Sequence, residues 1–341
     1  MLRFKPQQHK KFYYEPNGSE VWKLPSGNIF FAINMLLKLE VDIASGGATN
    51  APDYQIFNSI ERIELIQDSK KLIWSMAGQD YALLFGRDYG NGQAAPDNAL
   101  VAGSAASNVK GQYYLSAKSY PIGALVPWDY AIDTRAHDYE LKIKWRDLTA
   151  VGTIFGTHTG AITATNTENY LEVELDNAVP EITVASGKRD ALMTTIPHVV
   201  GLRSQKLSID ANNPQYRIDL PNIMKFHNIV IYTTHVVNTA QEVGKSDIIQ
   251  NKAKLFNTQQ TVFQDMLVEM VRQRTARRWG HGSNLNAGVY DFNMTAFGSF
   301  HDVMVSNNIN DLFMELDVVK QSNATYLRPI YVTQEMQGVP S

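Results

Sequence analysis

The sequence predicts a mainly β protein in which two similar antiparallel β-sandwiches stand in tandem, with short helices in long connections. Runs rich in β-branched and aromatic residues are bounded by Gly, Asn, Asp and Pro along the whole chain. These runs recur in the same order in the two halves, and 341 residues suffice for about two domains. Strands do not alternate with long helices, so a parallel α/β sheet is not expected.

Each expected strand is a short apolar run, and several alternate in polarity. In residues 139–145 apolar side chains alternate with charged ones, as in an antiparallel strand with one buried face. Residues 170–175 repeat this pattern. The expected strands are residues 29–43, 54–67, 71–74, 112–117, 139–145, 170–175, 198–209, 226–237, 252–256, 288–292, 312–319 and 326–333.

Two helices are expected between the strands. Apolar residues recur at spacings of three and four in residues 260–279, and Gly280 offers a C-terminal stop. A shorter helix is expected over residues 79–85. Small residues mark the longest loops, at residues 45–52, 90–111 and 180–197.

The internal repeat predicts the domain organisation. Residues 70–74 resemble 252–256, and in each half a short helical segment follows. The remaining pairs, in order, are 111–115 with 288–292, 139–145 with 312–319, and 170–175 with 326–332. We therefore expect an N-terminal arm (1–28), a first sandwich (29–180), a linker (181–197) and a second sandwich (198–341).

Composition excludes several classes of protein. Thirty-one Lys and Arg against 34 Asp and Glu leave a net charge of −3, which argues against a basic nucleic-acid coat. The absence of cysteine excludes disulfides, thiolate metal sites and a cysteine nucleophile. Charged residues make up 19% of the chain, below the roughly 25% of typical soluble proteins. This deficit indicates less free surface than a monomer of this size has.

Motifs for catalysis or metal binding are missing from the sequence. Gly244-Lys245-Ser246 resembles the end of a phosphate loop, but Thr239 stands where its first glycine belongs. No Gly-x-Ser-x-Gly elbow occurs. His227 and His235 share one face of an expected strand, a pattern more typical of ordinary histidines than of metal ligands. We expect no enzyme, no metal and no cofactor.

Two groups of basic residues are candidates for contacts with other molecules. The N-terminus mixes aromatic residues with cations, which suits an interface with anionic lipid headgroups. These cations are Arg3, Lys5, Lys10 and Lys11. A second group crowds the end of the 260–279 helix, where it complements the helix dipole or contacts phosphate. Its members are Arg272, Arg274, Arg277 and Arg278.

The order of elements resembles one family of viral proteins. Residues 260–278, followed by Gly288-Val289-Tyr290-Asp291-Phe292 and the two last strands, are similar to the end of the second domain in double jelly-roll major capsid proteins. Those proteins come from tailless icosahedral viruses with an internal membrane, bacteriophages among them. Residues 57–66 and 70–78 resemble the family's early paired strands, and the resemblance extends from about residue 29 to 333.

The resemblance implies two eight-stranded jelly rolls per chain and a homotrimeric, pseudo-hexagonal capsomer in an icosahedral shell. Residues 2–11 would then face the lipids of the internal membrane, and the loop at 90–111 would lie outward or between subunits. The arginine group would lie at an intersubunit or inner contact. The implied partners are further copies of the chain and penton and minor capsid proteins, without sequence-specific nucleic-acid binding. The protein would assemble in the host cytoplasm and reside in the virion.

Two other functions remain open at this point. One is a carbohydrate-binding or carbohydrate-active β-sandwich protein, for which Glu172 and Glu174 would be paired carboxylates on one strand face. Its exposed aromatic residues would be Trp22, Trp128 and Tyr130. The other is a viral spike or receptor-binding protein, which shares a β-rich fold.

Overall fold

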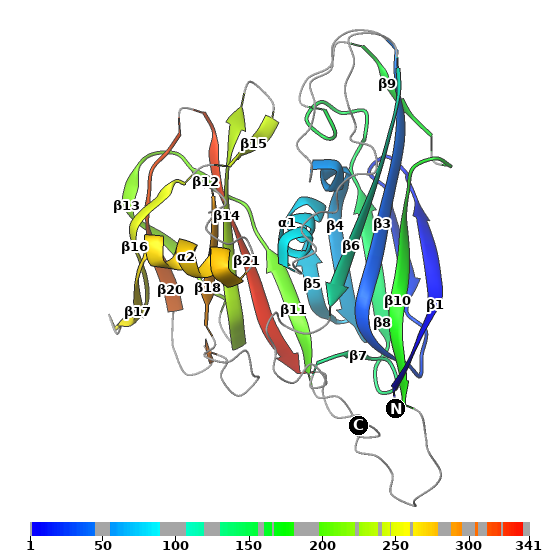
Figure 1. Cartoon of the computed structure of the whole chain (residues 1–341), viewed down its shortest axis with the longest axis horizontal. Coiled ribbons are helices and arrows are strands. Elements are labelled where there is room, and N and C mark those ends of the chain that lie inside the picture. The colour runs from blue at the N-terminus through cyan, green and yellow to red at the C-terminus, as the bar shows by residue number, and fades with distance from the viewer. Residues whose placement is uncertain are drawn as a thin grey trace, which may run out of the picture.

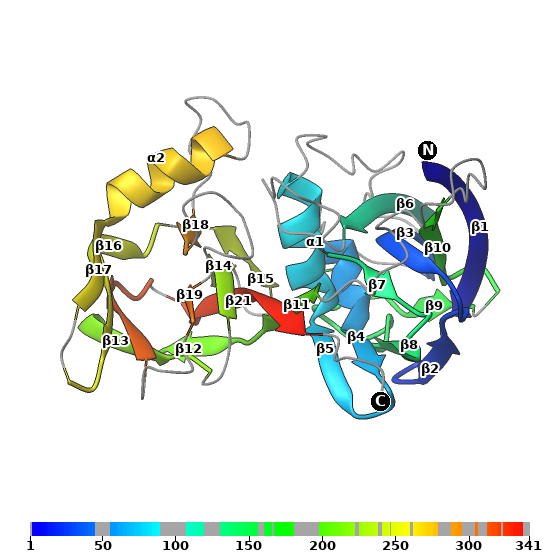
Figure 2. The same cartoon turned by 90° about the horizontal axis from the view of Figure 1, so that it is seen from below.

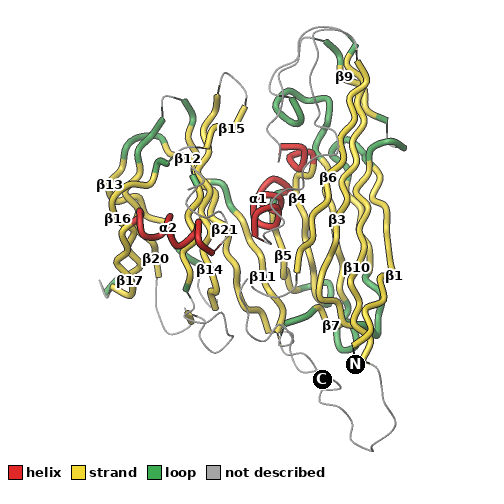
Figure 3. Tube along the Cα trace, in the orientation of Figure 1, coloured by secondary structure: helices red, strands yellow, loops and turns green. Residues whose placement is uncertain are grey.

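Strands dominate the computed structural model of the chain (Figure 3). It describes residues 2–44, 55–88, 107–118, 130–155, 160–165, 167–180, 198–221, 225–237, 241–245, 247–259, 262–278, 288–294, 304–305, 312–321 and 323–336. Within these ranges, the helices are η1 (Gln55–Ser59), α1 (Gly78–Asp88) and α2 (Val268–Arg278).

The first half of the chain, from residue 2 to residue 180, forms one β-sandwich. Its strands are β1 (Leu2–Tyr13), β2 (Ser19–Lys23), β3 (Ile29–Ile43), β4 (Ile60–Gln67), β5 (Lys71–Met76), β6 (Ser107–Lys118), β7 (Ile132–Asp133), β8 (Tyr139–Trp145), β9 (Ile162–Ala164) and β10 (Tyr170–Pro180). One sheet has the order β1-β10-β3-β6 and faces the other, β2-β8-β4-β5. The short β7 and β9 pair with β3.

The second half has the same architecture. Its strands are β11 (His198–Ser204), β12 (Leu207–Ile209), β13 (Asn213–Asp219), β14 (Lys225–Val237), β15 (Gln241–Lys245), β16 (Ile249–Asn257), β17 (Val262–Leu267), β18 (Val289–Asn293), β19 (Met304–Val305), β20 (Leu312–Val318) and β21 (Thr325–Met336). One sheet has the order β11-β21-β14-β18, and the other has the order β13-β20-β16-β17.

These strand orders define the jelly roll. In each half the first, eighth, third and sixth principal strands form one sheet, and the second, seventh, fourth and fifth form the other. Alternating side chains fill the space between the sheets: every second residue of β8 is buried, as the sequence pattern predicts. The expected fold, two eight-stranded antiparallel jelly rolls in tandem, is confirmed.

The two jelly rolls lie side by side, with α1 between them (Figures 1 and 2). Their sheets are continuous, because β11 of the second roll pairs in parallel with β5 of the first. The Trp74 indole N–H donates to the carbonyl oxygen of Val200 at 2.7 Å across this seam. The Tyr232 hydroxyl donates to the carbonyl oxygen of Leu83 in α1 at 2.6 Å. Buried hydrogen bonds therefore connect the two jelly rolls.

The expected helix over residues 260–279 is wrong in its first part. Residues 262–267 form β17, which pairs with β16, and the helix begins only at Val268. Short apolar runs at helical spacing are ambiguous, and pairing with a neighbouring strand decided this one. Each roll consequently has a hairpin followed by an 11-residue helix, β4–β5–α1 and β16–β17–α2.

This equivalence also changes one pair of the predicted repeat. Residues 70–74 lie mainly on β5, the second strand of its hairpin, whereas 252–256 lie on β16, the first strand. The other three pairs place β6 with β18, β8 with β20 and β10 with β21, which are equivalent in the two strand orders. Similar composition cannot distinguish the two strands of one hairpin.

Residues that we assigned to an N-terminal arm belong to the first jelly roll. β1 pairs with β10 along its length, with a bulge between Pro6 and Gln8, and β2 pairs with β8. Edge strands commonly carry lysine, proline and bulges, which prevent pairing with other chains. The same features make β1 look like a polar tail. The expected linker at 181–197 and most of the loops at 45–52 and 90–111 lie outside the described residues.

Candidate functional site

The N-terminal cations all lie on the edge strand β1. Lys10 forms an ion pair with Glu20 of β2. The Lys11 ammonium lies 3.9 Å from a carboxylate oxygen of Glu172 and 4.4 Å from the centroid of the Tyr170 ring, both on β10. These two cations therefore bind within their own jelly roll. Arg3 and Lys5 follow the same strand, but their side chains lie outside the described ones.

The arginine group lies on α2, in the second roll, and the structure does not bring it near β1 (Figure 1). Arg272 forms ion pairs with Asp247 at 2.8 Å and with Glu269 at 3.5 Å. Arg274 is exposed, while the side chains of Arg277 and Arg278 lie outside the described ones. Of the two arginines whose side chains are described, Arg272 is therefore paired within the chain and Arg274 is exposed to solvent.

An apolar surface adjoins this helix. Leu267 at the end of β17 and Met270 in α2 are 55% and 50% exposed, respectively. Beside them, α2, β17 and β18 enclose a cavity of about 390 Å³, lined by Val271, Phe292 and the exposed Arg274 among others. Leu267 and Met270 are therefore the exposed apolar side chains nearest to the arginine group along the chain.

The residues considered for sugar or metal chemistry do not assemble into a site. Glu172 and Glu174 point away from the core on β10, whose apolar residues alternate with them. His227 is fully buried and its Nε2 lies 2.8 Å from the Tyr130 hydroxyl, while His235 is half-buried. Among the described residues, no three His, Asp or Glu side chains gather where a metal ion could sit.

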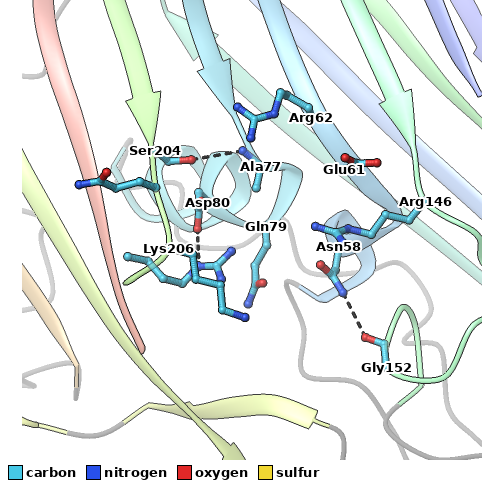
Figure 4. Close-up of a pocket in the computed structure, with 12 residues that line it drawn as sticks. Asn58, Glu61, Arg62, Ala77, Gln79, Asp80, Arg146, Gly152, Ser204 and Lys206 are labelled. Carbon is cyan, nitrogen blue, oxygen red and sulfur yellow. Dashed lines mark hydrogen bonds and ion pairs between the residues drawn. The ribbon is translucent and has the colours of Figure 1, made fainter. Parts of the chain in front are cut away.

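A polar cavity lies between the two jelly rolls (Figure 4). No motif in the sequence predicts it. It has a volume of about 350 Å³. The first roll supplies residues of β4, the start of α1 and the segment after β8, and the second supplies the β11–β12 turn and β21. The lining residues are Asn58, Glu61, Arg62, Ala77, Gln79, Asp80, Arg146, Gly152, Ser204, Gln205, Lys206 and Arg328.

A buried ion pair forms one wall of this cavity. The Arg328 guanidinium of β21 donates to the Asp80 carboxylate of α1 at 2.6 Å, and both side chains are at most 5% exposed. The Ala77 amide N–H donates to the Ser204 hydroxyl at 3.3 Å, and this hydrogen bond also joins the two rolls. The sequence offers one signal for this pair: Arg328 is a charged residue within the apolar run at 326–333, so it needs a buried acidic partner.

Two side-chain donors in the cavity lack an acceptor among the described residues. The Nε of Arg146 and the Nε2 of Gln79 are buried and have no hydrogen-bond partner among the described residues. Arg62 donates to the Ser75 hydroxyl at 2.6 Å. The Lys206 ammonium lies 3.7 Å from the centroid of the Tyr326 ring. The arrangement suits a negatively charged group rather than a reaction.

Comparison with solved structures identifies the fold of the chain, whereas comparison of its sequence finds no relative. No protein-family model and no curated protein matches the chain. The STIV major capsid protein, from Sulfolobus turreted icosahedral virus, aligns over 98% of this chain and 96% of its own, with a TM-score of 0.70 and 11% identity. The PBCV-1 virus capsid aligns over 99% and 97%, with a TM-score of 0.63 and 10% identity.

A third solved structure, the major capsid protein of bacteriophage PM2, aligns over 97% of this chain and 100% of its own, with a TM-score of 0.55 and 12% identity. These alignments span both jelly rolls. The chain therefore has the double jelly-roll fold, and the solved structures it resembles are double jelly-roll major capsid proteins of viruses.

Proposed function

We propose that the protein is a major capsid protein that self-assembles into the shell of an icosahedral virion. The observation that carries this proposal is the pair of complete jelly rolls, side by side in one chain, which aligns over 98% of its length with the STIV major capsid protein. Shell building needs interfaces rather than catalytic groups, so the protein acts as a structural component and not as an enzyme.

The capsomer is a homotrimer with six jelly rolls in a pseudo-hexagonal outline. Exposed apolar side chains on both jelly rolls support this, because the two rolls form opposite sides of the molecule (Figure 1). Tyr13 and Tyr114, on the outer sheet of the first roll, are 50% and 54% exposed, and Leu267 and Met270 lie on the second roll. If the first roll of one chain contacts the second roll of the next, the contact is head-to-tail. Such contacts close the chains into a ring when the rotation from one chain to the next permits.

The end of the molecule at which β1 begins and β21 ends faces the inside of the shell. Leu2 pairs with Pro180 and His198 with Met336, and Figure 1 shows the start of β1 and the end of β21 at the same end of the molecule. Anionic headgroups of an internal membrane there would bind Arg3 and Lys5. Within the described residues, no helix has the length and apolar character needed to cross that membrane.

Penton and minor capsid proteins are the other partners in the virion. The virion assembles in the host cytoplasm.

The carbohydrate-binding or carbohydrate-active alternative gains no support from the described residues. Tyr130 is buried against His227, and Trp22 is half-buried against the core, so they form no exposed aromatic platform. Trp128 lies outside the described residues. Glu172 interacts with Lys11, as expected of an outer strand face.

Sedimentation of the purified chain tests the proposal. We expect a species of three times the 38.3 kDa chain mass. The double substitution Leu267→Asp and Met270→Asp should dissociate it, because charge is depleted at the cores of such interfaces. Val21→Asp is the matched control, since Val21 is 49% exposed on β2, a strand that carries none of the proposed contact residues. A stable monomer at micromolar concentration would overturn the proposal.

A further inference from the structure

We propose that the polar cavity at the junction of the two jelly rolls binds a phosphate group. The ligand is inorganic phosphate or a small phosphate monoester, held between the first roll and the second. This inference is independent of shell assembly, because every residue that it uses belongs to one chain (Figure 4).

Two buried donors lack partners in the cavity. Gln79 is 4% exposed and lines the cavity, and its amide nitrogen has no acceptor among the described residues. The Nε of Arg146 is also buried without an acceptor there. A buried donor left unsatisfied destabilises the folded chain, so native proteins rarely keep two together without a ligand or water.

The charges in the cavity favour an anion. Its two carboxylates already have cations, since Glu61 pairs with Lys144 at 2.9 Å and Asp80 pairs with Arg328. Arg62 and Arg146 form no ion pair among the described residues. Two guanidinium groups that line the cavity, of the exposed Arg62 and the half-buried Arg146, therefore have no carboxylate partner among these residues. Arginine is the side chain that recognises phosphate with paired donors.

The position of Gln79 adds to this preference. Gln79 lies in the first turn of α1, an 11-residue helix whose N-terminal end carries a partial positive charge. Anions commonly bind at such ends because free amide N–H groups point outward there. The cavity volume of about 350 Å³ lies within the range of small-ligand sites.

A bound phosphate would tie the two rolls together. Arg62 and Arg146 come from the first roll, whereas Ser204 and Lys206 come from the second. A ligand that binds only the folded junction raises the stability of the chain in proportion to the logarithm of its concentration. Phosphate would therefore stabilise the junction between the two jelly rolls reversibly.

Calorimetric titration of the purified full chain tests the proposal, at constant ionic strength set with chloride. One arm uses inorganic phosphate and the other uses adenosine monophosphate. We expect one site per chain in at least one arm, and the arm that binds identifies the source of the phosphate group. Thermal unfolding should shift upward with the same ligand. Absence of binding in both arms would overturn the proposal.

Variants localise the site. Arg146→Gln should weaken phosphate binding by about tenfold or more, because it removes charge-assisted hydrogen bonds. Arg62→Gln gives a second, independent test if Arg146→Gln fails to fold by circular dichroism. Arg217→Gln is the matched control, since Arg217 lies on β13 outside the cavity. Equal affinity in a folded cavity variant and in the control would refute this site.

Discussion

The buried ion pair between Asp80 and Arg328 should contribute strongly to the stability of the junction. Replacing Asp80 with alanine removes the carboxylate from a guanidinium that is only 5% exposed. Arg217 and Asp219 offer a matched control, because their N–O distance is also 2.6 Å while their side chains are 48% and 77% exposed. The comparison keeps the contact distance constant and varies burial.

The magnitude follows from the distance and the burial. Two unit charges 2.6 Å apart attract by about 6 kcal/mol at an effective dielectric constant of roughly 20. Desolvation of both groups offsets part of this attraction. Breaking a buried pair by removing one partner therefore costs about 3–5 kcal/mol. The exposed pair is screened by water, so Asp219→Ala should cost about 0–1 kcal/mol.

Urea unfolding followed by tryptophan fluorescence measures both effects, at one protein concentration and without phosphate. Trp74 and Trp145 are buried in the first roll and report its unfolding. The double variant Asp80→Leu with Arg328→Met should recover much of the loss, because apolar replacements remove both buried charges. A loss below about 1 kcal/mol in Asp80→Ala, or equal losses at the two pairs, would refute the reasoning.

Three further outcomes are expected. Trp74→Phe should cost about 1–3 kcal/mol in urea unfolding, because the Val200 carbonyl loses its donor across the seam. Gly78→Ala should cost about 1–3 kcal/mol in thermal unfolding, since a Cβ there meets a backbone oxygen at 2.2 Å. Hydrogen bonds from a threonine hydroxyl and amide hold the pKa of Asp147 below its ordinary value of 3.8. Its contribution is therefore complete above that value and lost as pH falls through the lowered pKa, so the stability gap between wild type and Asp147→Asn should shrink in strong acid.

Much of the fold was predictable because alternation along a strand reflects burial directly. Residues 139–145 and 170–175 read as half-buried strands and are β8 and β10. The N-terminal strand was missed, because an edge strand protected by lysines resembles a polar tail. Residues 262–267 were assigned to a helix, because their spacing fits a helix and their pairing partner is remote from local sequence.

The basic groups illustrate a different limit. The sequence showed that Lys10, Lys11 and Arg272 exist, but not that each has an acidic partner in the same chain. Such partners come from other strands, and spacing along one strand carries no information about them. The junction cavity was not predicted for the same reason, since its lining comes from segments as distant as Asn58 and Arg328.

The amino-acid sequence by itself determined the β-rich class, the tandem repeat and the shortage of charge, because each is a property of composition or of short-range periodicity. Only the tertiary structure decided how the two rolls join. The parallel pairing of β5 with β11, the buried Asp80–Arg328 pair and the donors facing the cavity all depend on contacts between distant segments. Those contacts form when side chains pack and lose water together, which no local pattern records.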